Sequence, residues 1–276
     1  MSSTARFEAR PATSQSYSLG EGPLWDRDRN RLLWVDIEAG LVCAGRLDRD
    51  TDAVRVTDTW EFGDLACAVA VARGGDLLVA ERHDLTWVRP DGSRERLVRL
   101  VESEGSRLND GAVDPQGRYL VGSMALDDRQ GRERLLRWDG SDVTVLDDDL
   151  TLSNGLAWSP SGDRLYSIDS IPGVIHVRDY PGGPRSELFR VTDGLPDGLC
   201  VDSDGNLWIA VHERGEVRCF TPRGELLAVV DVAAPKTTSV AFAGPNLDVL
   251  VITAAEGPLF TARVGAVGLH TPYWHH

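Results

Sequence analysis

The chain lacks an apolar run long enough to cross a membrane, and it lacks an excess of basic residues. Its 276 residues include 29 Lys+Arg and 43 Asp+Glu, which gives a formal net charge of -14. Residues 1–19 contain no apolar core and carry Glu8 early, unlike a signal peptide. A nucleic-acid binder normally shows a basic stripe along its sequence, and this chain shows none. We therefore expect neither a nucleic-acid partner nor a membrane association.

Cysteine is scarce, and its four copies are dispersed without a CxxC pair. They are Cys43, Cys67, Cys200 and Cys219. Dispersed thiols in a chain without a signal peptide predict free, reduced cysteines and a cytoplasmic location. A GxSxG motif is missing as well, which argues against a serine nucleophile of the α/β-hydrolase type.

No segment shows the 3.6-residue apolar period of a helix; the period is two throughout. What recurs is a polar residue followed by a short apolar run. The copies are Arg31-LLWVD, Asp76-LLVAE, Arg118-YLVGS, Arg164-LYSID, Asn206-LWIAV and Asp248-VLVIT. Their starting positions differ by 45, 42, 46, 42 and 42 residues. Before each copy lies a segment in which apolar residues alternate with small or polar ones and which ends in a Gly/Pro/Asp/Asn turn. Each repeat therefore predicts a β-hairpin.

Six copies at this period are typical of the four-stranded blades of a β-propeller. We predict an all-β fold, a six-bladed β-propeller with four-stranded antiparallel blades, as a single domain over residues 1–276. Residues 5–18 precede the first inner strand. They are expected to add the outer strand of the last blade and so close the ring.

Counting back nine or ten residues from each copy reaches the residue that opens each inner strand. These residues are Glu21, Ala66, Asn109, Asn154, Asp197 and Thr238. In a propeller, equivalent positions converge at one end of the central channel, and four of the six carry carboxylate or amide oxygens. Such oxygens suit a hard divalent cation. Asn-Gly and Asp-Gly are also ordinary turn sequences, but turn formation does not explain the shared register.

The loops that follow the second strand of each hairpin are expected to reach the same face. Their polar residues are Asp36, Glu38, Glu81, His83, Asp127, Asp169, His212, Glu213 and Glu256. Most of these residues have the character of solvated loops. His83 and His212 are substrate-binding candidates because imidazole can hydrogen-bond a sugar and titrates near neutrality.

The sequence resembles the senescence marker protein/gluconolactonase family, which includes regucalcin and the sugar lactonases. The resemblance is carried by LGEGPLWD (19–26), SRLNDGAVDPQGRYLVGSM (106–124), SNGLAWSPSGDRLYSIDS (153–170), PDGLCVDSDGNLWIAV (196–211) and PKTTSVAFAGPNLD (235–248). These stretches span nearly the whole chain in the family's order. The resemblance implies a six-bladed propeller, the architecture that the repeats predict independently.

The resemblance also implies roles for individual residues. It implies that Glu21, Asn154 and Asp197 are the protein ligands of a single divalent ion. It implies that Arg107 and Asn109 hold hydroxyl groups of the substrate.

One position departs from the family's pattern. The family often has a Glu three residues after the Met of its GTM-type motif, and here Asp127 follows Met124 at that distance. The shorter side chain retracts the carboxylate, so we expect an altered contact between Asp127 and the substrate.

Together these features predict a metal-dependent hydrolase that opens a small sugar lactone to the aldonic acid. The ion would polarise the ring carbonyl, and Asp197 would accept the proton of the attacking water. Oxygen ligands leave Ca, Zn, Mg, Mn and Fe(II) open as the metal. Two alternatives remain: a calcium-dependent phosphotriesterase or aryl-ester lactonase with a similar ring, and a non-catalytic ligand-binding propeller. Arg107, two residues before Asn109, favours the sugar-lactone branch over the phosphotriesterase.

Overall fold

The computed structural model describes residues 4–275, and within that range it contains strands and no helix, as predicted. Three antiparallel four-stranded sheets follow one another along the chain. The first contains β7 (Ala66–Val71), β8 (Leu77–Glu81), β9 (Asp84–Val88) and β10 (Arg94–Arg99). The second contains β11 (Ser106–Val113), β12 (Tyr119–Ala125), β13 (Glu133–Trp138) and β14 (Val143–Leu150). The third contains β15 (Ser153–Trp158), β16 (Arg164–Asp169), β17 (Val174–Asp179) and β18 (Ser186–Arg190).

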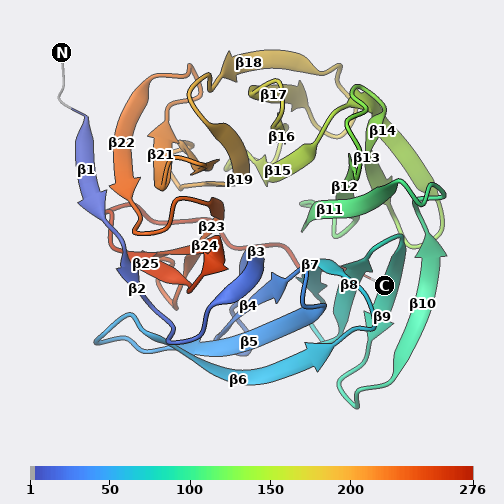
Figure 1. Cartoon of the computed structure of the whole chain (residues 1–276), viewed down its shortest axis with the longest axis horizontal. Helices are drawn as coiled ribbons and strands as arrows, with labels where there is room; N and C mark the ends of the chain where they lie inside the picture. Colours follow the sequence, from blue (N-terminus) through green and yellow to red (C-terminus); the bar gives the residue numbers. More distant parts are fainter. Residues whose placement is uncertain (1–3, 276) are drawn as a thin grey trace.

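The other strands form a five-stranded and an eight-stranded sheet. The former joins β19 (Leu195–Val201), β20 (Leu207–His212), β21 (Glu216–Phe220), β22 (Leu226–Asp231) and β1 (Ala5–Glu8). The latter joins β3 (Tyr17–Asp26), β4 (Arg31–Asp36), β5 (Leu41–Leu47) and β6 (Val54–Glu61) to β23 (Thr237–Ala243), β24 (Val249–Gly257), β25 (Phe260–Ala262) and β2 (Arg10–Pro11). Figure 1 shows the sheets as a ring, with β3, β7, β11, β15, β19 and β23 nearest its centre.

The repeated apolar run becomes the second strand from the centre, in β4, β8, β12, β16, β20 and β24. Each of these strands is paired on both sides, which explains why its residues are almost all apolar. Trp34 and Leu165 are completely buried. The outermost strands, such as β6 and β10, have mostly exposed or half-buried side chains instead.

The N-terminal segment was predicted to add the outer strand of the last blade, and the structure confirms this in part. Arg10 and Pro11 pair with β25, so they close the last sheet as expected. Residues 5–8 run parallel to β22 of the neighbouring sheet, which the sequence did not predict. Ala5 pairs with Ala228 there, and the Arg6 guanidinium bonds to the Asp231 carboxylate at the strand end. The segment therefore spans two sheets and ties them together.

The inner strands surround a cavity of about 440 Å³. Small side chains line its wall at equivalent places, among them Ala70, Ala112 and Ala157. The chain segment 269–272 closes the end of the cavity that lies farthest from the start of the inner strands. Its continuation is anchored on the ring, because Trp274 N–H donates to the Val71 carbonyl at 2.9 Å.

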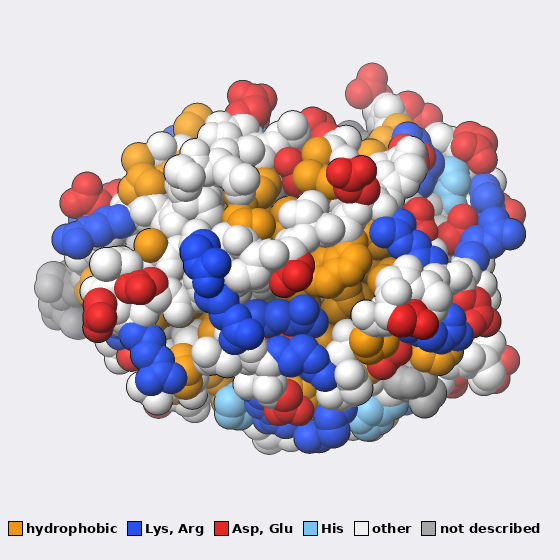
Figure 2. Space-filling model, turned by 90° about the horizontal axis from the view of Figure 1, so that it is seen from below, with side chains coloured by type: hydrophobic (Ala, Val, Ile, Leu, Met, Phe, Trp, Pro, Cys, Tyr) orange, Lys and Arg blue, Asp and Glu red, His pale blue; other side chains and the backbone are white. Residues whose placement is uncertain are grey.

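The surface is not uniformly acidic despite the net charge. Figure 2 shows Lys and Arg side chains gathered in a band on the face that lies at the bottom of Figure 1. Several arginines are engaged with the protein itself. Arg29 and Arg31 both pair with the buried Asp26, and Arg94 lies over the Phe62 ring.

Two further expectations can be compared with the structure. All four cysteines are free, as predicted. In the part of the chain that the structure describes, no helix is long and apolar enough to cross a membrane.

Candidate metal and substrate site

Strand pairing defines the ring position at which each inner strand opens. In five of the inner strands, one residue pairs with the last residue of the repeated apolar run in the next strand. The pairs are Gly20–Asp36, Ala66–Glu81, Leu108–Ser123, Ser153–Asp169 and Pro196–Val211. The ring position is the next residue in each strand, which gives Glu21, Cys67, Asn109, Asn154 and Asp197. Four of these five residues match the sequence-based assignment.

Two positions in that assignment were wrong by one residue. Cys67, not Ala66, occupies the ring position of β7. The hairpin is one residue shorter than assumed: Val71 pairs with Leu77, whereas Trp25 pairs with Leu32 in the first hairpin.

The same shift applies to β23. Ala243 pairs with Val249 in this equally short hairpin, which makes Ser239 the ring residue in place of Thr238. The Thr238 hydroxyl instead bonds to the Gly20 carbonyl and the Thr253 hydroxyl.

Glu21 and Asp197 are buried carboxyl groups that repel each other. Burial raises the pKa of Glu21 well above its usual range, and the neighbouring charges of Asp197 and Asp110 raise it further. The pKa of Asp197 is likewise raised by burial and by Asp110, while the Asn154 amide and the Arg107 charge oppose the shift. Two acids held in this way are poised to bind a cation, because the cation would relieve both causes of the shift.

Asn154 and Asp197 each leave one oxygen unsatisfied. The Asn154 side-chain amide donates to Ser170 Oγ at 3.1 Å. Its Oδ1 and the Oδ1 of Asp197 are buried and have no hydrogen-bond partner among the described residues. Buried polar atoms normally have partners, so two orphaned oxygens in one ring call for an explanation.

Arg107 and Asn109 form a hydrogen-bonded pair on β11. Arg107 Nη1 donates to Asn109 Oδ1 and to the Leu108 carbonyl, both at 2.8 Å. The Asn109 amide donates to the Ser153 carbonyl at 3.0 Å, which fixes its orientation. The same guanidinium nitrogen lies 3.9 Å from Cys67 Sγ, across the boundary between two sheets. Both side chains are buried, so the fold holds them in place before any substrate arrives.

A divalent metal ion suits this set of residues. Glu21, Asn154 and Asp197 offer only oxygen atoms, two of which lack a partner. Hard cations prefer such oxygens. The described residues contain no group of three His, Cys, Asp or Glu side chains arranged to hold a metal. The candidate set is of a different kind, because an amide supplies one of its three ligands.

Asp110 was not among the predicted site residues, because the sequence analysis counted only the residue that opens each inner strand. It lies in β11 where the pairing register shifts between Leu108 and Gly111. Burial raises the pKa of its carboxyl to about 6. Its charge also acts on both Glu21 and Asp197. Sequence alone gave one signal: Asp110 is the only carboxylate directly after a ring residue, a position held by glycine in three other strands.

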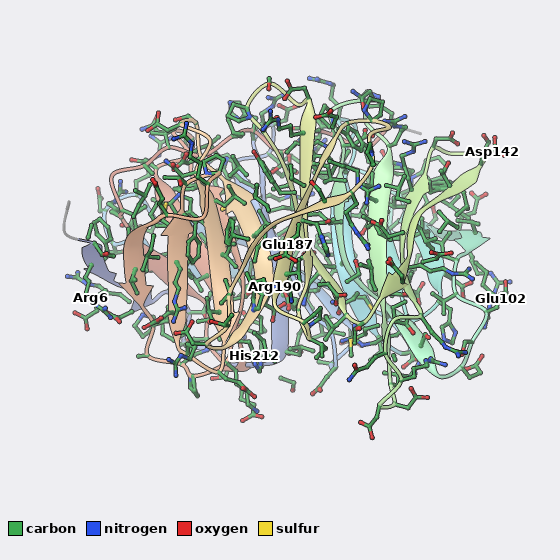
Figure 3. All side chains as sticks on the ribbon, turned by 90° about the horizontal axis from the view of Figure 1, so that it is seen from above. Arg6, Glu102, Asp142, Glu187, Arg190 and His212 are labelled. Carbon is green, nitrogen blue, oxygen red and sulfur yellow. The ribbon has the colours of Figure 1, made fainter. Side chains whose placement is uncertain are left out.

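The three remaining substrate-binding candidates lie in different environments. His83 is buried; its Nε2–H donates to the Ser106 carbonyl at 3.0 Å, and its Nδ1 accepts from Arg99. Asp127 is exposed and accepts from the Arg129 N–H at 3.1 Å. His212 ends β20 and lies at one end of the ring in Figure 3. Its Nδ1 has no hydrogen-bond partner among the described residues, and burial lowers its pKa. His212 thus has a buried ring nitrogen without a partner among the described residues, whereas both nitrogens of His83 are used.

Two acidic residues expected on the rim have a structural role instead. Asp36 accepts hydrogen bonds from the N–H groups of Ser18 and Leu19, both at 2.9 Å. Asp169 does the same for the N–H groups of Thr151 and Leu152. Both carboxylates are buried, and each holds the chain segment that leads into an inner strand.

Comparison with known proteins places the chain in a family. The model of the SMP-30/gluconolactonase/LRE-like region matches residues 19–256, and the chain belongs to this family. Pentonolactonase XacC of Haloferax volcanii is 36% identical over 88% of this chain and 83% of its own length. Regucalcin of Xenopus laevis is 34% identical over 88% of this chain and 85% of its own length. A solved structure of a calcium-binding protein, regucalcin from Agrobacterium tumefaciens, has a TM-score of 0.90 and 22% identity, with both chains fully covered. This likeness identifies the fold as a β-propeller.

Proposed function

We propose that the protein is a divalent-metal-dependent lactonase that opens a small sugar lactone to the aldonic acid. In this proposal the eight-stranded sheet counts as two blades of a six-bladed propeller, and residues 1–276 are one domain. The observation that carries the proposal is the pair of orphaned buried oxygens on Asn154 and Asp197, in a ring with Glu21. The pentonolactonase relative and the gluconolactonase family name support the choice of substrate.

The roles of the residues follow from their contacts. Glu21, Asn154 and Asp197 would hold the ion, which supplies Lewis-acid polarisation of the lactone carbonyl. Arg107 and Asn109 would orient the ring hydroxyls, because their side chains are already fixed by hydrogen bonds.

The reaction itself requires one proton acceptor. Water adds to the carbonyl carbon, the bond from that carbon to the ring oxygen breaks, and the ring oxygen takes up a proton. Asp197 would accept the proton from the water and return it to the departing ring oxygen.

The test is hydrolysis of gluconolactone by metal-stripped protein, with Ca, Mg, Mn, Zn and Fe(II) added back one at a time. We expect at least one ion to restore turnover and Asp197→Ala to remain inactive with that ion. Removal of a group that handles the proton typically costs about 10²–10⁴-fold in rate. The matched control is Asp204→Ala, which removes an exposed carboxylate from a turn at the opposite end of its hairpin.

Two results would contradict the proposal in different ways. Protein that binds no divalent ion would refute the metal site. Protein that binds an ion but opens no sugar lactone would refute the substrate class, and aryl esters and organophosphates would then be compared on the same protein.

A further inference from the structure

Asp110 is a carboxylate without a cation of its own. Its Oδ1 accepts the N–H of Gly111 at 2.8 Å. Within residues 4–275 no ion pair includes Asp110. Its side chain lines the cavity beneath the ring, which Glu21 and Asp197 do not line. A buried charge without a partner is costly, so its presence next to the ring requires a reason.

The charged side chains around the ring lack two positive charges for neutrality. Three carboxylates, Glu21, Asp110 and Asp197, interact with one another, and Arg107 is the one cation that acts on the two ring acids. Three negative charges and one positive charge give a net charge of -2. A divalent cation would bring this group of charges to neutrality.

Asp110 occupies a different position in its strand from the proposed metal ligands. It follows the ring residue Asn109, and the equivalent places after Glu21, Asn154 and Asp197 are held by Gly22, Gly155 and Gly198. Gly155 and Gly198 are tightly confined: a Cβ at Gly198 would lie 2.1 Å from Ser239 Oγ, and one at Gly155 would lie 2.6 Å from the Asp197 carbonyl. At those two places a longer side chain would collide with the next strand. A Cβ at Gly22 would meet nothing within 4 Å, but the φ of +53° at this residue is one that residues with a side chain rarely adopt. Among these four places, Asp110 is therefore the one where both the backbone and the packing admit a further acid.

We propose that Asp110 is a positioning residue whose charge, without coordinating the ion, sets the affinity and the charge preference of the metal site. The proposal rests on the metal site of the proposed function. It makes the third carboxylate responsible for selecting an ion of charge +2 or higher. Asn in its place would keep the hydrogen bond with Gly111 and remove only the charge.

The experiment measures ion binding rather than turnover. Ca²⁺ binding is followed by calorimetry on metal-stripped protein, and Tb³⁺ binding by its luminescence, for the wild type and Asp110→Asn. We expect a loss of at least about tenfold in Ca²⁺ affinity, and a loss of about 30-fold in Tb³⁺ affinity where the Ca²⁺ loss is tenfold. The losses differ because the electrostatic energy scales with the charge of the ion. We also expect metal-free Asp110→Asn to melt at a higher temperature than the wild type, because a buried repulsion is gone.

Controls separate the charge effect from other causes. Asp128→Asn removes one exposed acid from a nearby loop and should leave both affinities within twofold of the wild type. Asp110→Ser removes the same charge with a different shape and should reproduce the loss if Asp110→Asn folds poorly. Unchanged Ca²⁺ affinity in folded Asp110→Asn, or equal losses for the two ions, would overturn the inference and leave the lactonase proposal standing. A wild type that binds neither Ca²⁺ nor Tb³⁺ would overturn the inference, and the lactonase proposal would fall with it only if Mg, Mn, Zn and Fe(II) did not bind either.

Discussion

Arg107 has two opposing effects on the candidate site. Its guanidinium donates to Asn109 Oδ1, and in the proposed function it orients the substrate hydroxyls. Its positive charge also lowers the pKa of Glu21 and of Asp197, and it would repel a cation bound between them. In the proposed function, Arg107 would thus favour substrate binding at the expense of metal binding.

Arg107→Met separates these two effects. We expect KM for gluconolactone to rise about 10- to 100-fold, because hydrogen bonds to a charged group are lost. We expect the affinity for the divalent ion, measured by calorimetry at pH 8.5, to rise several-fold, because a like charge is removed. Arg134→Met, at an exposed position of β13, changes the net charge equally and should alter neither quantity. A fall in metal affinity in Arg107→Met would show that the guanidinium supports the metal ligands rather than repelling the ion.

At the scale of the strand, close packing between neighbouring inner strands holds the proposed metal ligands in place. β15, β19 and β23 are adjacent, and glycines make their close approach possible. Gly198 directly follows Asp197, and a Cβ there would lie 2.1 Å from Ser239 Oγ and 2.7 Å from Ser239 Cα. The backbone of β23 would have to move for any larger residue to fit, and Asp197 would move with β19.

Gly198→Ala should therefore weaken both the fold and the metal site. Overpacking of this kind costs about 1–3 kcal/mol in the free energy of unfolding, which chemical denaturation can measure. Divalent affinity should fall at the same time, because Asp197 is displaced from the other ligands. Gly182→Ala is the matched control, since a Cβ at Gly182 meets nothing within 4 Å. If Gly198→Ala loses stability but keeps its metal affinity, Asp197 is positioned independently of this contact.

The sequence predicted the strands and most of the ring because both follow from repetition. Segments in which apolar and polar residues alternate identify the hairpins. Counting back nine or ten residues from each repeated run places Glu21, Asn109, Asn154 and Asp197 in one register. Counting failed at Cys67 and Ser239 because turn length varies by one residue between hairpins, and local sequence does not reveal that length.

Other features could not be predicted because they depend on contacts between distant segments. Asp36 and Asp169 bind backbone N–H groups 17 or 18 residues away. The charge of Asp110 raises the pKa of Glu21 and of Asp197, which belong to two other sheets. The parallel pairing of β1 with β22 joins residues more than 200 positions apart, and no short-range pattern encodes it.

At the scale of the whole molecule, the C-terminal segment contacts three neighbouring sheets that are far from it in the sequence. Trp274 is buried, with its ring 6.1 Å from that of Trp87 and 6.2 Å from that of Trp138. Tyr273 Oη accepts the Asp28 N–H at 3.1 Å, at the end of β3 opposite to Glu21. The segment therefore stabilises the end of the ring that lies away from the proposed metal ligands.

Trp274→Ala should lower stability without changing the metal site. Truncation of a buried Trp typically costs about 3–5 kcal/mol in the free energy of unfolding, and the loss of contacts to two other tryptophans places this residue in that range. Divalent affinity of the folded variant should stay within twofold of the wild type, because the ligands open the inner strands at the other end. His270→Ala, an exposed change in the same segment, should affect neither quantity. If Trp274→Ala also lost metal affinity while still folded, the two ends of the ring would be coupled, and the ligands would depend on closure of the whole molecule rather than on the packing of neighbouring inner strands.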